Sequence, residues 1–268
     1  MSIALYVRAR GPDVTRLAAT IAATVALGGC GTENVCPSGP HSTYDLLALS
    51  STSEVETVQQ LAPIATRQIA ARAADGCGLV RTGITTNGTV SNLQITAVQA
   101  TLPSGTSANR RPVIAQYERE LTGGLKAFAT QLDRTKPTPG SPVYSTIHRA
   151  IEEHVDTSPG AAGPLVIAAL TDGIAVERTD RGRLIDLRAR TVDRAALREI
   201  TTTLARTVEN ARIMVSVLIV GFGANSRLGD ARINQARAIL TRTLNKAGIA
   251  VRFSRNEVPA DPTEQRGS

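Results

Sequence analysis

Short, largely apolar runs alternate with segments of helical periodicity along most of the chain. The apolar runs predict buried strands, and they occupy residues 44–50, 78–86, 165–170, 213–220 and 249–253. Apolar side chains spaced three or four residues apart predict amphipathic helices, which we expect at residues 53–75, 112–132, 143–154, 193–210 and 232–247. Strands and helices therefore follow one another in regular alternation.

This alternation predicts an α/β fold with a doubly wound, mostly parallel sheet and helices on both faces. Asn87 and Gly88 form a typical hairpin-turn pair, and residues 93–102 alternate apolar and polar side chains. Because such a turn sends the chain back antiparallel, we expect one antiparallel edge strand there. Residues 174–188 carry many charges and predict a small hairpin on the surface.

The amino-terminal residues have the features of an export signal in the usual order. A positively charged leader precedes an uncharged stretch at 17–29, which is too short to span a membrane and has the length of a signal-peptide core. Small residues then precede Cys30, which resembles the lipobox of bacterial lipoproteins, where the Cys receives a diacylglycerol and palmitate. We expect a signal peptide over 1–29, lipidation of Cys30 and a polar tether over 30–42. The alternative is an ordinary cleaved signal or a buried helix.

The chain has three cysteines, and two remain once Cys30 is assigned to the lipid. An even number of cysteines in an oxidising compartment favours a disulfide. Cys36 precedes the first predicted strand and Cys77 precedes the second, and neighbouring parallel strands begin at the same edge of a sheet. We therefore predict a bond between Cys36 and Cys77; two separate thiols are the alternative. The cysteine and histidine spacings do not form a zinc site.

Charge and aromatic content limit the classes of partner. The net charge is +7, but the basic residues are spread along the chain without a block of like charge. Aromatic residues make up 3% and Trp is absent, so the stacking surfaces that bind single-stranded nucleic acid are not expected. We expect no nucleic-acid partner, whereas a basic surface is compatible with anionic lipid or an acidic wall polymer.

Three polar segments are expected at the carboxyl ends of the central strands, where open α/β sheets bind ligands. They are residues 50–54 after the first strand, 137–141 before a helix, and 170–173 after the fourth strand. These loops are the candidate functional site.

The same segments carry a resemblance to the von Willebrand factor A domain. LVIAALTDG at 165–173 resembles that family's fourth strand and turn, and GSPVYSTIHRAI at 140–151 resembles its conserved helix entry. IMVSVLIVGFG at 213–223 and YDLLALSSTS at 44–53 resemble the fifth and first strands. The resemblance covers residues 43–254 and implies a Rossmann-like adhesion fold, with a polar tail over 255–268.

The resemblance also implies a metal-ion-dependent adhesion site, but a degenerate one. The family's site combines Asp-x-Ser-x-Ser after the first strand, a Thr on a middle loop and the Asp of the TDG turn. Here the matching ligands are Ser51, Ser53, Ser141 and Asp172, and Leu49 stands where the leading Asp is expected. Because Mg²⁺ prefers several oxygen ligands in a tight octahedron, three hydroxyls and one carboxylate imply a weak site.

A second alignment places Ser50, Thr52 and Glu54 in the Asp-x-Ser-x-Ser pattern, again without the leading Asp. In a purely structural interpretation, the serines cap the following helix and Asp172 orders its own turn. We therefore expect either no cofactor or a weakly bound Mg²⁺.

The function that the sequence predicts is a binding module rather than an enzyme. We expect a lipid-anchored domain on the extracytoplasmic face of the cell membrane, recognising a protein or an envelope polymer through the carboxyl-end loops. Two alternatives stay open: an envelope enzyme that uses a carboxylate in the same crevice, and a structural subunit of a surface or secretion assembly.

Overall fold

The computed structural model describes residues 33–49, 55–85, 93–136, 139–157, 163–224 and 227–261. The chain divides into two compact units, Met1–Gly31 and Thr32–Ser268, and every described residue belongs to the second. The predicted signal peptide and the predicted ligands or modification sites Cys30, Ser51 and Ser53 lie outside the described residues. Within the described ranges, no helix is both long and apolar enough to cross a membrane.

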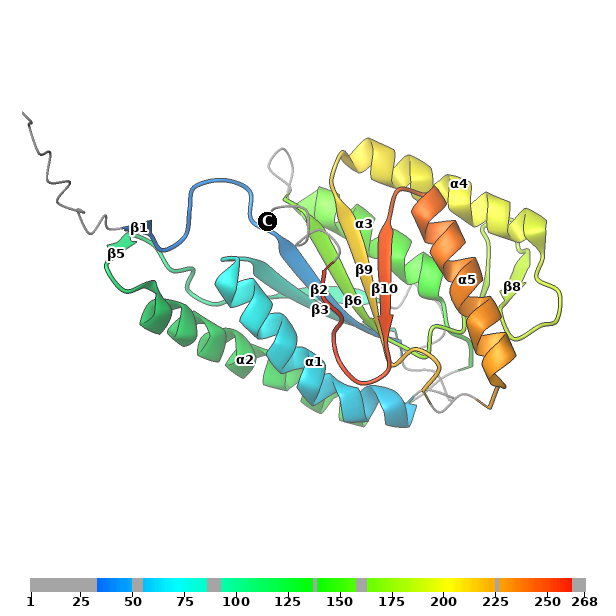
Figure 1. The fold of residues 1–268 in the computed structure, drawn as a ribbon, viewed down its shortest axis with the longest axis horizontal. Helices are drawn as coiled ribbons and strands as arrows, with labels where there is room; N and C mark the ends of the chain where they lie inside the picture. The colour runs from blue at the N-terminus through cyan, green and yellow to red at the C-terminus, as the bar shows by residue number, and fades with distance from the viewer. Residues whose placement is uncertain are drawn as a thin grey trace, which may run out of the picture. The chain divides into compact units, whose positions relative to one another are not determined.

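Six strands form the central sheet (Figure 1). Their order is β10-β9-β6-β2-β3-β4; the first five run parallel, and β4 is antiparallel to β3. Their bounds are β2 (Thr43–Leu49), β3 (Leu79–Thr85), β4 (Gln94–Val98), β6 (Leu165–Leu170), β9 (Val215–Val220) and β10 (Ala250–Ser254). The predicted α/β class, with a doubly wound sheet and one antiparallel edge strand, is confirmed.

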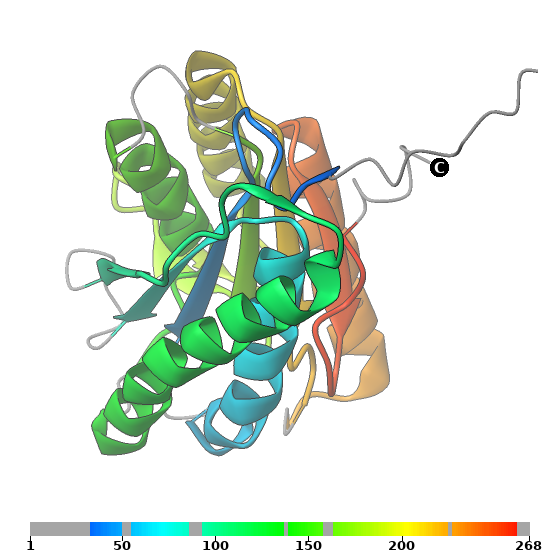
Figure 2. The ribbon, with the colours of Figure 1, turned by 90° about the vertical axis from the view of Figure 1, so that its left-hand side faces the viewer.

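Helices cover both faces of this sheet, so the domain has three layers (Figures 1 and 2). One face packs against α1 (Val55–Asp75) and α2 (Arg110–Arg134). The other packs against α3 (Val143–Thr157), α4 (Arg194–Ala211) and α5 (Asp230–Lys246). Every residue of the central strand β2 is buried. Leu46 and Ala48 belong to the α1–α2 core, whereas Leu47 and Leu49 belong to the α3–α5 core, because successive side chains of a strand point to opposite faces.

Two predicted elements differ from the structure. The edge strand was expected over 93–102 but ends at Val98, because Val98 already lies opposite Val80 and β3 begins one residue earlier, at Leu79. The hairpin expected on the surface at 174–188 exists as β7 (Val176–Arg178) and β8 (Leu184–Asp186), but its apolar side is inside the core: Ile185 is fully buried.

Both polar ends of the described domain are attached to it. Within the segment predicted as a tether, β1 (Glu33–Asn34) pairs with β5 (Thr106–Ser107), and Val35 is buried. After β10, the backbone oxygens of Val258 and Pro259 accept hydrogen bonds from the Arg72 guanidinium of α1 at 2.9 and 2.7 Å. The folded unit therefore includes residues that precede β2 and residues that follow β10 in the sequence.

Candidate functional site

The direction in which the chain adds strands to the sheet reverses between β2 and β6. The chain adds β3 and β4 on one side of β2, and then returns to add β6, β9 and β10 on the other. At such a switch point, the loops beyond the carboxyl ends of the two strands diverge and leave a crevice, which is where doubly wound sheets bind ligands. The carboxyl ends of β2 and β6 therefore mark the candidate site.

Two of the three predicted polar loops meet at this place. Ser141 precedes α3 and Thr171 follows β6, and their side-chain oxygens are 3.5 Å apart. Ser141, Thr171 and the adjacent Asp172 are all buried, with at most 5% of their surface exposed. Of the four predicted metal ligands, the structure thus brings the Ser141 and Asp172 segments together, while Ser51 and Ser53 belong to residues that it does not describe.

The TDG turn is ordered by its own side chains. Thr171 Oγ1 accepts a hydrogen bond from the Gly173 N–H at 3.0 Å, and Asp172 Oδ1 accepts one from the Ile174 N–H at 2.8 Å. Gly173 has a φ of +71°, and a Cβ at this position would collide with the Phe222 ring. Only glycine tolerates this combination of backbone angle and close packing. The structural role that the sequence allowed for Asp172 is therefore present.

The loop that carries Ser141 is held by the β7–β8 hairpin. Ser141 and Val176 exchange two backbone hydrogen bonds of 3.0 and 3.1 Å. The next residue, Glu177, accepts hydrogen bonds from the backbone N–H groups of Tyr144 and Ser145 and from the Ser145 hydroxyl. It therefore caps the first turn of α3 from a distant part of the chain. Burial raises the pKa of Glu177 to about 7, although these three hydrogen bonds favour its charged form.

The described part of the predicted metal site offers few carboxylates to a divalent ion. Asp172 is the one carboxylate among the described members of the predicted ligand set, and one of its oxygens already bonds to the Ile174 N–H. Among the described residues, no group of three or more His, Cys, Asp or Glu side chains is placed to hold an ion. Mg²⁺ prefers a nearly complete octahedron of oxygen ligands, and Ser51 and Ser53 of the predicted set lie outside the described residues.

A cation of the protein itself lies near the same turn. Arg188 bonds to Asp186 at 3.0 Å, and this bond, together with the negative charges of Asp186 and Asp172, raises the pKa of Arg188. Arg188 is not among the residues predicted from the sequence, because its position depends on where the β7–β8 hairpin packs.

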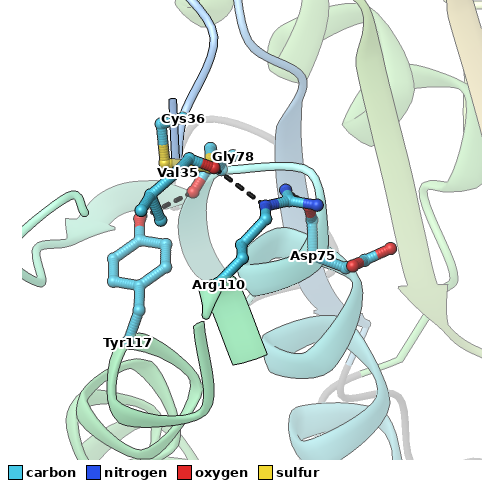
Figure 3. Close-up of a disulfide and its surroundings, with 7 residues drawn as sticks. Val35, Cys36, Asp75, Gly78, Arg110 and Tyr117 are labelled. Atoms are coloured by element: carbon cyan, nitrogen blue, oxygen red, sulfur yellow. Dashed lines mark hydrogen bonds between the residues drawn. A yellow bond between two sulfur atoms is a disulfide. The ribbon is translucent and has the colours of Figure 1, made fainter. Parts of the chain in front are cut away.

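The opposite, amino edge of the sheet contains the predicted disulfide (Figure 3). Cys36 and Cys77 are bonded, with their Cα atoms 5.7 Å apart, which lies within the usual range for disulfides. Around this bond, Arg110 donates to the backbone oxygens of Val35 and Asp75, and the Tyr117 hydroxyl donates to the Gly78 oxygen at 2.8 Å. The first turns of α2 are thereby hydrogen-bonded to residues on both sides of the disulfide, next to Cys36 and next to Cys77.

A second polar cluster lies inside the α3 face of the sheet, closer to the amino edge. Arg81 and Asp45 are register partners on β3 and β2, and they form a bidentate ion pair with distances of 2.6 and 2.7 Å. Arg81 also donates to the Ala150 oxygen and the Thr157 hydroxyl of α3. Both charges are almost fully buried and satisfied by one another, so this cluster connects the sheet to α3 and does not form an open site.

The proteins of known structure that are similar to this chain share little sequence with it. No protein-family model matches the sequence, and no curated protein matches it. Two crystal structures of the pilus adhesin SpaC from Lactobacillus rhamnosus GG are similar, with 13% and 12% identity over 82% of this chain, 29% of the adhesin chain and a TM-score of 0.43. A von Willebrand factor type A protein from Catenulispora acidiphila is similar with 11% identity over 81% of this chain, 39% of that chain and a TM-score of 0.37.

The chain thus spans less than a third of the adhesin and about two fifths of the Catenulispora acidiphila protein. The neighbours include a protein of the von Willebrand factor A class, which is the class that the sequence resembles. At these identities and TM-scores, no conclusion about the function of this chain follows from the likeness.

Proposed function

We propose that this protein is a lipid-anchored recognition module that binds a protein or an envelope polymer at the β2–β6 switch point and catalyses no reaction. One observation carries the proposal: Ser141, Thr171 and Asp172, from two separate loops, converge at the carboxyl edge where the strand order reverses. Such a position is where sheets of this kind present ligand-binding loops.

Export of the protein from the cytosol agrees with the disulfide between Cys36 and Cys77. The Cys36–Cys77 bond persists in oxidising compartments and is rare in the cytosol. Lipidation at Cys30 on the extracytoplasmic face of the cell membrane joins the lipid to the chain six residues before Cys36. The disulfide then holds the anchored segment at the amino edge, and the proposed binding loops lie at the other end of the strands.

The carboxylates near the switch point favour binding over catalysis, because each one accepts hydrogen bonds from the protein itself. Glu177 accepts three hydrogen bonds at the start of α3, and Asp186 pairs with Arg188. Asp172 orders its own turn. A general acid or base needs a carboxylate directed at a substrate, whereas these three groups hold the protein's own backbone and side chains.

Capture of partners by the exported chain tests this function. The Asp172→Asn variant keeps an oxygen for the Ile174 N–H but removes the charge, so the turn is retained while the negative charge at the switch point is lost. We expect the proteins or polymers captured from a native envelope fraction by the wild type to fall at least about tenfold for this variant. Asp133→Asn, at an exposed position of α2, is the matched control and should capture the same partners as the wild type. Equal capture by all three proteins would contradict the proposal.

The weak metal site gives a separate prediction. Because Asp172 has few carboxylate neighbours and Arg188 supplies a positive charge nearby, we expect titration calorimetry with Mg²⁺ to show no binding in the micromolar range. Melting curves recorded with Mg²⁺ and with EDTA should coincide. Micromolar affinity that disappears in Asp172→Ala would show that the site is a functional metal centre.

A further inference from the structure

A groove lies between helix α2 and the edge strand β4, on the side of the sheet remote from β10. Its volume is about 570 Å³, and it is lined by β3, β4 and the carboxyl-terminal half of α2. Val98 belongs to the α2 side of β4, because a Cβ at Gly124 would lie 2.6 Å from its Cγ1 atom. Gly124 therefore brings the helix close to one end of β4, and the groove opens along the rest of the strand.

The edge strand lacks the features that normally prevent pairing with another chain. Edge strands are usually protected by charged side chains, Pro or bulges, since their outer backbone groups are a template for a further strand. β4 has the sequence QITAV, and it has β3 as its one strand partner in the described sheet. No Asp, Glu, Lys or Arg occurs between Arg81 and Arg110, although the chain contains 30 basic and 23 acidic residues.

The groove beside this strand is uncharged as well. Its wall consists of small or apolar side chains, including Ala127 and Phe128 of α2, and of neutral polar side chains such as Thr96 and Gln131. None of its lining residues is ionisable. Two other surface grooves differ: the one between α4 and α5 contains Arg198, Arg242 and Lys246, and the one between α3 and α4 contains both acidic and basic residues.

We propose that β4 and α2 form a second interaction surface, which binds an extended, uncharged polypeptide segment of a partner protein as an added strand. Backbone groups of the segment pair with the outer edge of β4, and every second side chain enters the groove toward α2, as in other β-strand additions beside a helix. The uncharged lining of the groove selects an uncharged partner segment, because a charged side chain that enters the groove loses water without meeting an opposite charge. This surface is independent of the β2–β6 switch point.

Neutral octapeptides, acetylated and amidated at their ends, test the proposal with the exported chain. One set alternates Val or Ala with Thr, Ser or Gln, and a second set has Lys or Glu at every second position. We expect several members of the neutral set to bind at least about tenfold more tightly than their charged counterparts. Strand addition pairs alternate residues only, so hydrogen exchange should slow at alternate amides of Gln94–Val98 and not at all five.

A pair of helix variants locates the site. Ala127 and Ala238 are exposed alanines on α2 and α5, and Ala127 lines the groove. Ala127→Glu should weaken neutral-peptide binding at least about tenfold through the desolvation cost of a buried charge, while Ala238→Glu should leave it unchanged. Failure of every neutral peptide to protect alternate β4 amides would overturn the proposal. So would a β4-to-β4 dimer of the chain in sedimentation experiments, because the occupant would then be a second copy.

Discussion

The disulfide region at the amino edge of the sheet and the TDG turn at its carboxyl edge are held by different kinds of side-chain contact. At the amino edge, a disulfide joins residues 41 positions apart, and Arg110 and Tyr117 reach backbone oxygens that are 35 to 75 positions away. At the carboxyl edge, Thr171 and Asp172 bond to backbone N–H groups two positions further along. The disulfide region is therefore held by contacts between distant segments. The side chains of the TDG turn bond within the turn itself, while its backbone also bonds to Val220 and Gly223.

This difference separates stability from recognition. A covalent bond between distant residues restricts the conformations of the unfolded chain, so the disulfide should contribute strongly to the free energy of unfolding. When the side chains of a turn bond within the turn, residues on its outer surface can be substituted without unfolding the domain. Binding loops on rigid scaffolds commonly tolerate such substitutions. We therefore expect a large loss of stability when the disulfide is removed and a small one when a side chain of the TDG turn is changed.

The largest effect is expected for the disulfide. The double variant Cys36→Ser/Cys77→Ser should lower the free energy of unfolding by about 4 kcal/mol, as chain entropy predicts for a loop of this length. Urea denaturation followed by circular dichroism measures the change, and Cys30→Ser serves as the control that retains the bond. A loss of less than about 1 kcal/mol would show that the amino edge does not depend on this cross-link.

An intermediate effect is expected from pH, with opposite signs at the two ends of α3. Burial raises the pKa of Glu177 from 4.5 to about 7, so its contribution to stability falls as pH rises through this interval. Relative to the wild type, Glu177→Gln should gain on the order of 2–3 kcal/mol between pH 4.5 and 7. Unfolding free energies measured in matched buffers at each pH test this slope; a difference that does not change with pH would contradict it.

His154, near the other end of α3, should behave in the opposite sense. It is fully buried, and Nε2 lies 3.0 Å from the Gly163 oxygen. Burial, with the positive charge of Arg81 adding to it, lowers the pKa of His154 below 6.5, so its contribution to stability is lost as pH falls below 6.5. The His154→Gln variant should therefore gain stability relative to the wild type on acidification. A constant difference between the two proteins from pH 7 to 5 would refute the assignment.

The smallest effect is expected at the TDG turn. Asp172→Ala removes one hydrogen bond to the Ile174 N–H and should cost about 1 kcal/mol of unfolding free energy. Thermal and urea denaturation provide the measurement, with Asp172→Asn as the variant that keeps the acceptor. A loss as large as that of the disulfide variant would mean that this edge also carries the stability of the fold.

Patterns within short windows determined the fold class. The run Leu165–Leu170 predicts a buried strand because all six of its side chains are apolar. The TDG that follows predicts a turn because glycine readily adopts the positive φ that Gly173 has. The disulfide between Cys36 and Cys77 was also predictable, since parallel neighbours such as β2 and β3 begin at one edge. Periodicity and sheet geometry are sufficient for features of this kind.

Contacts between distant segments were decided by the tertiary structure alone. Glu177 caps α3 from 32 positions away, and Arg81 meets Asp45 across 36 positions. The groove of β4 and α2 likewise depends on how closely Gly124 lets the helix approach Val98. No local pattern encodes such pairs, because each depends on packing angles between elements that are set by the whole core. The sequence by itself determined the elements and the class of fold, and packing decided which polar side chains hold the domain together and which surfaces stay open.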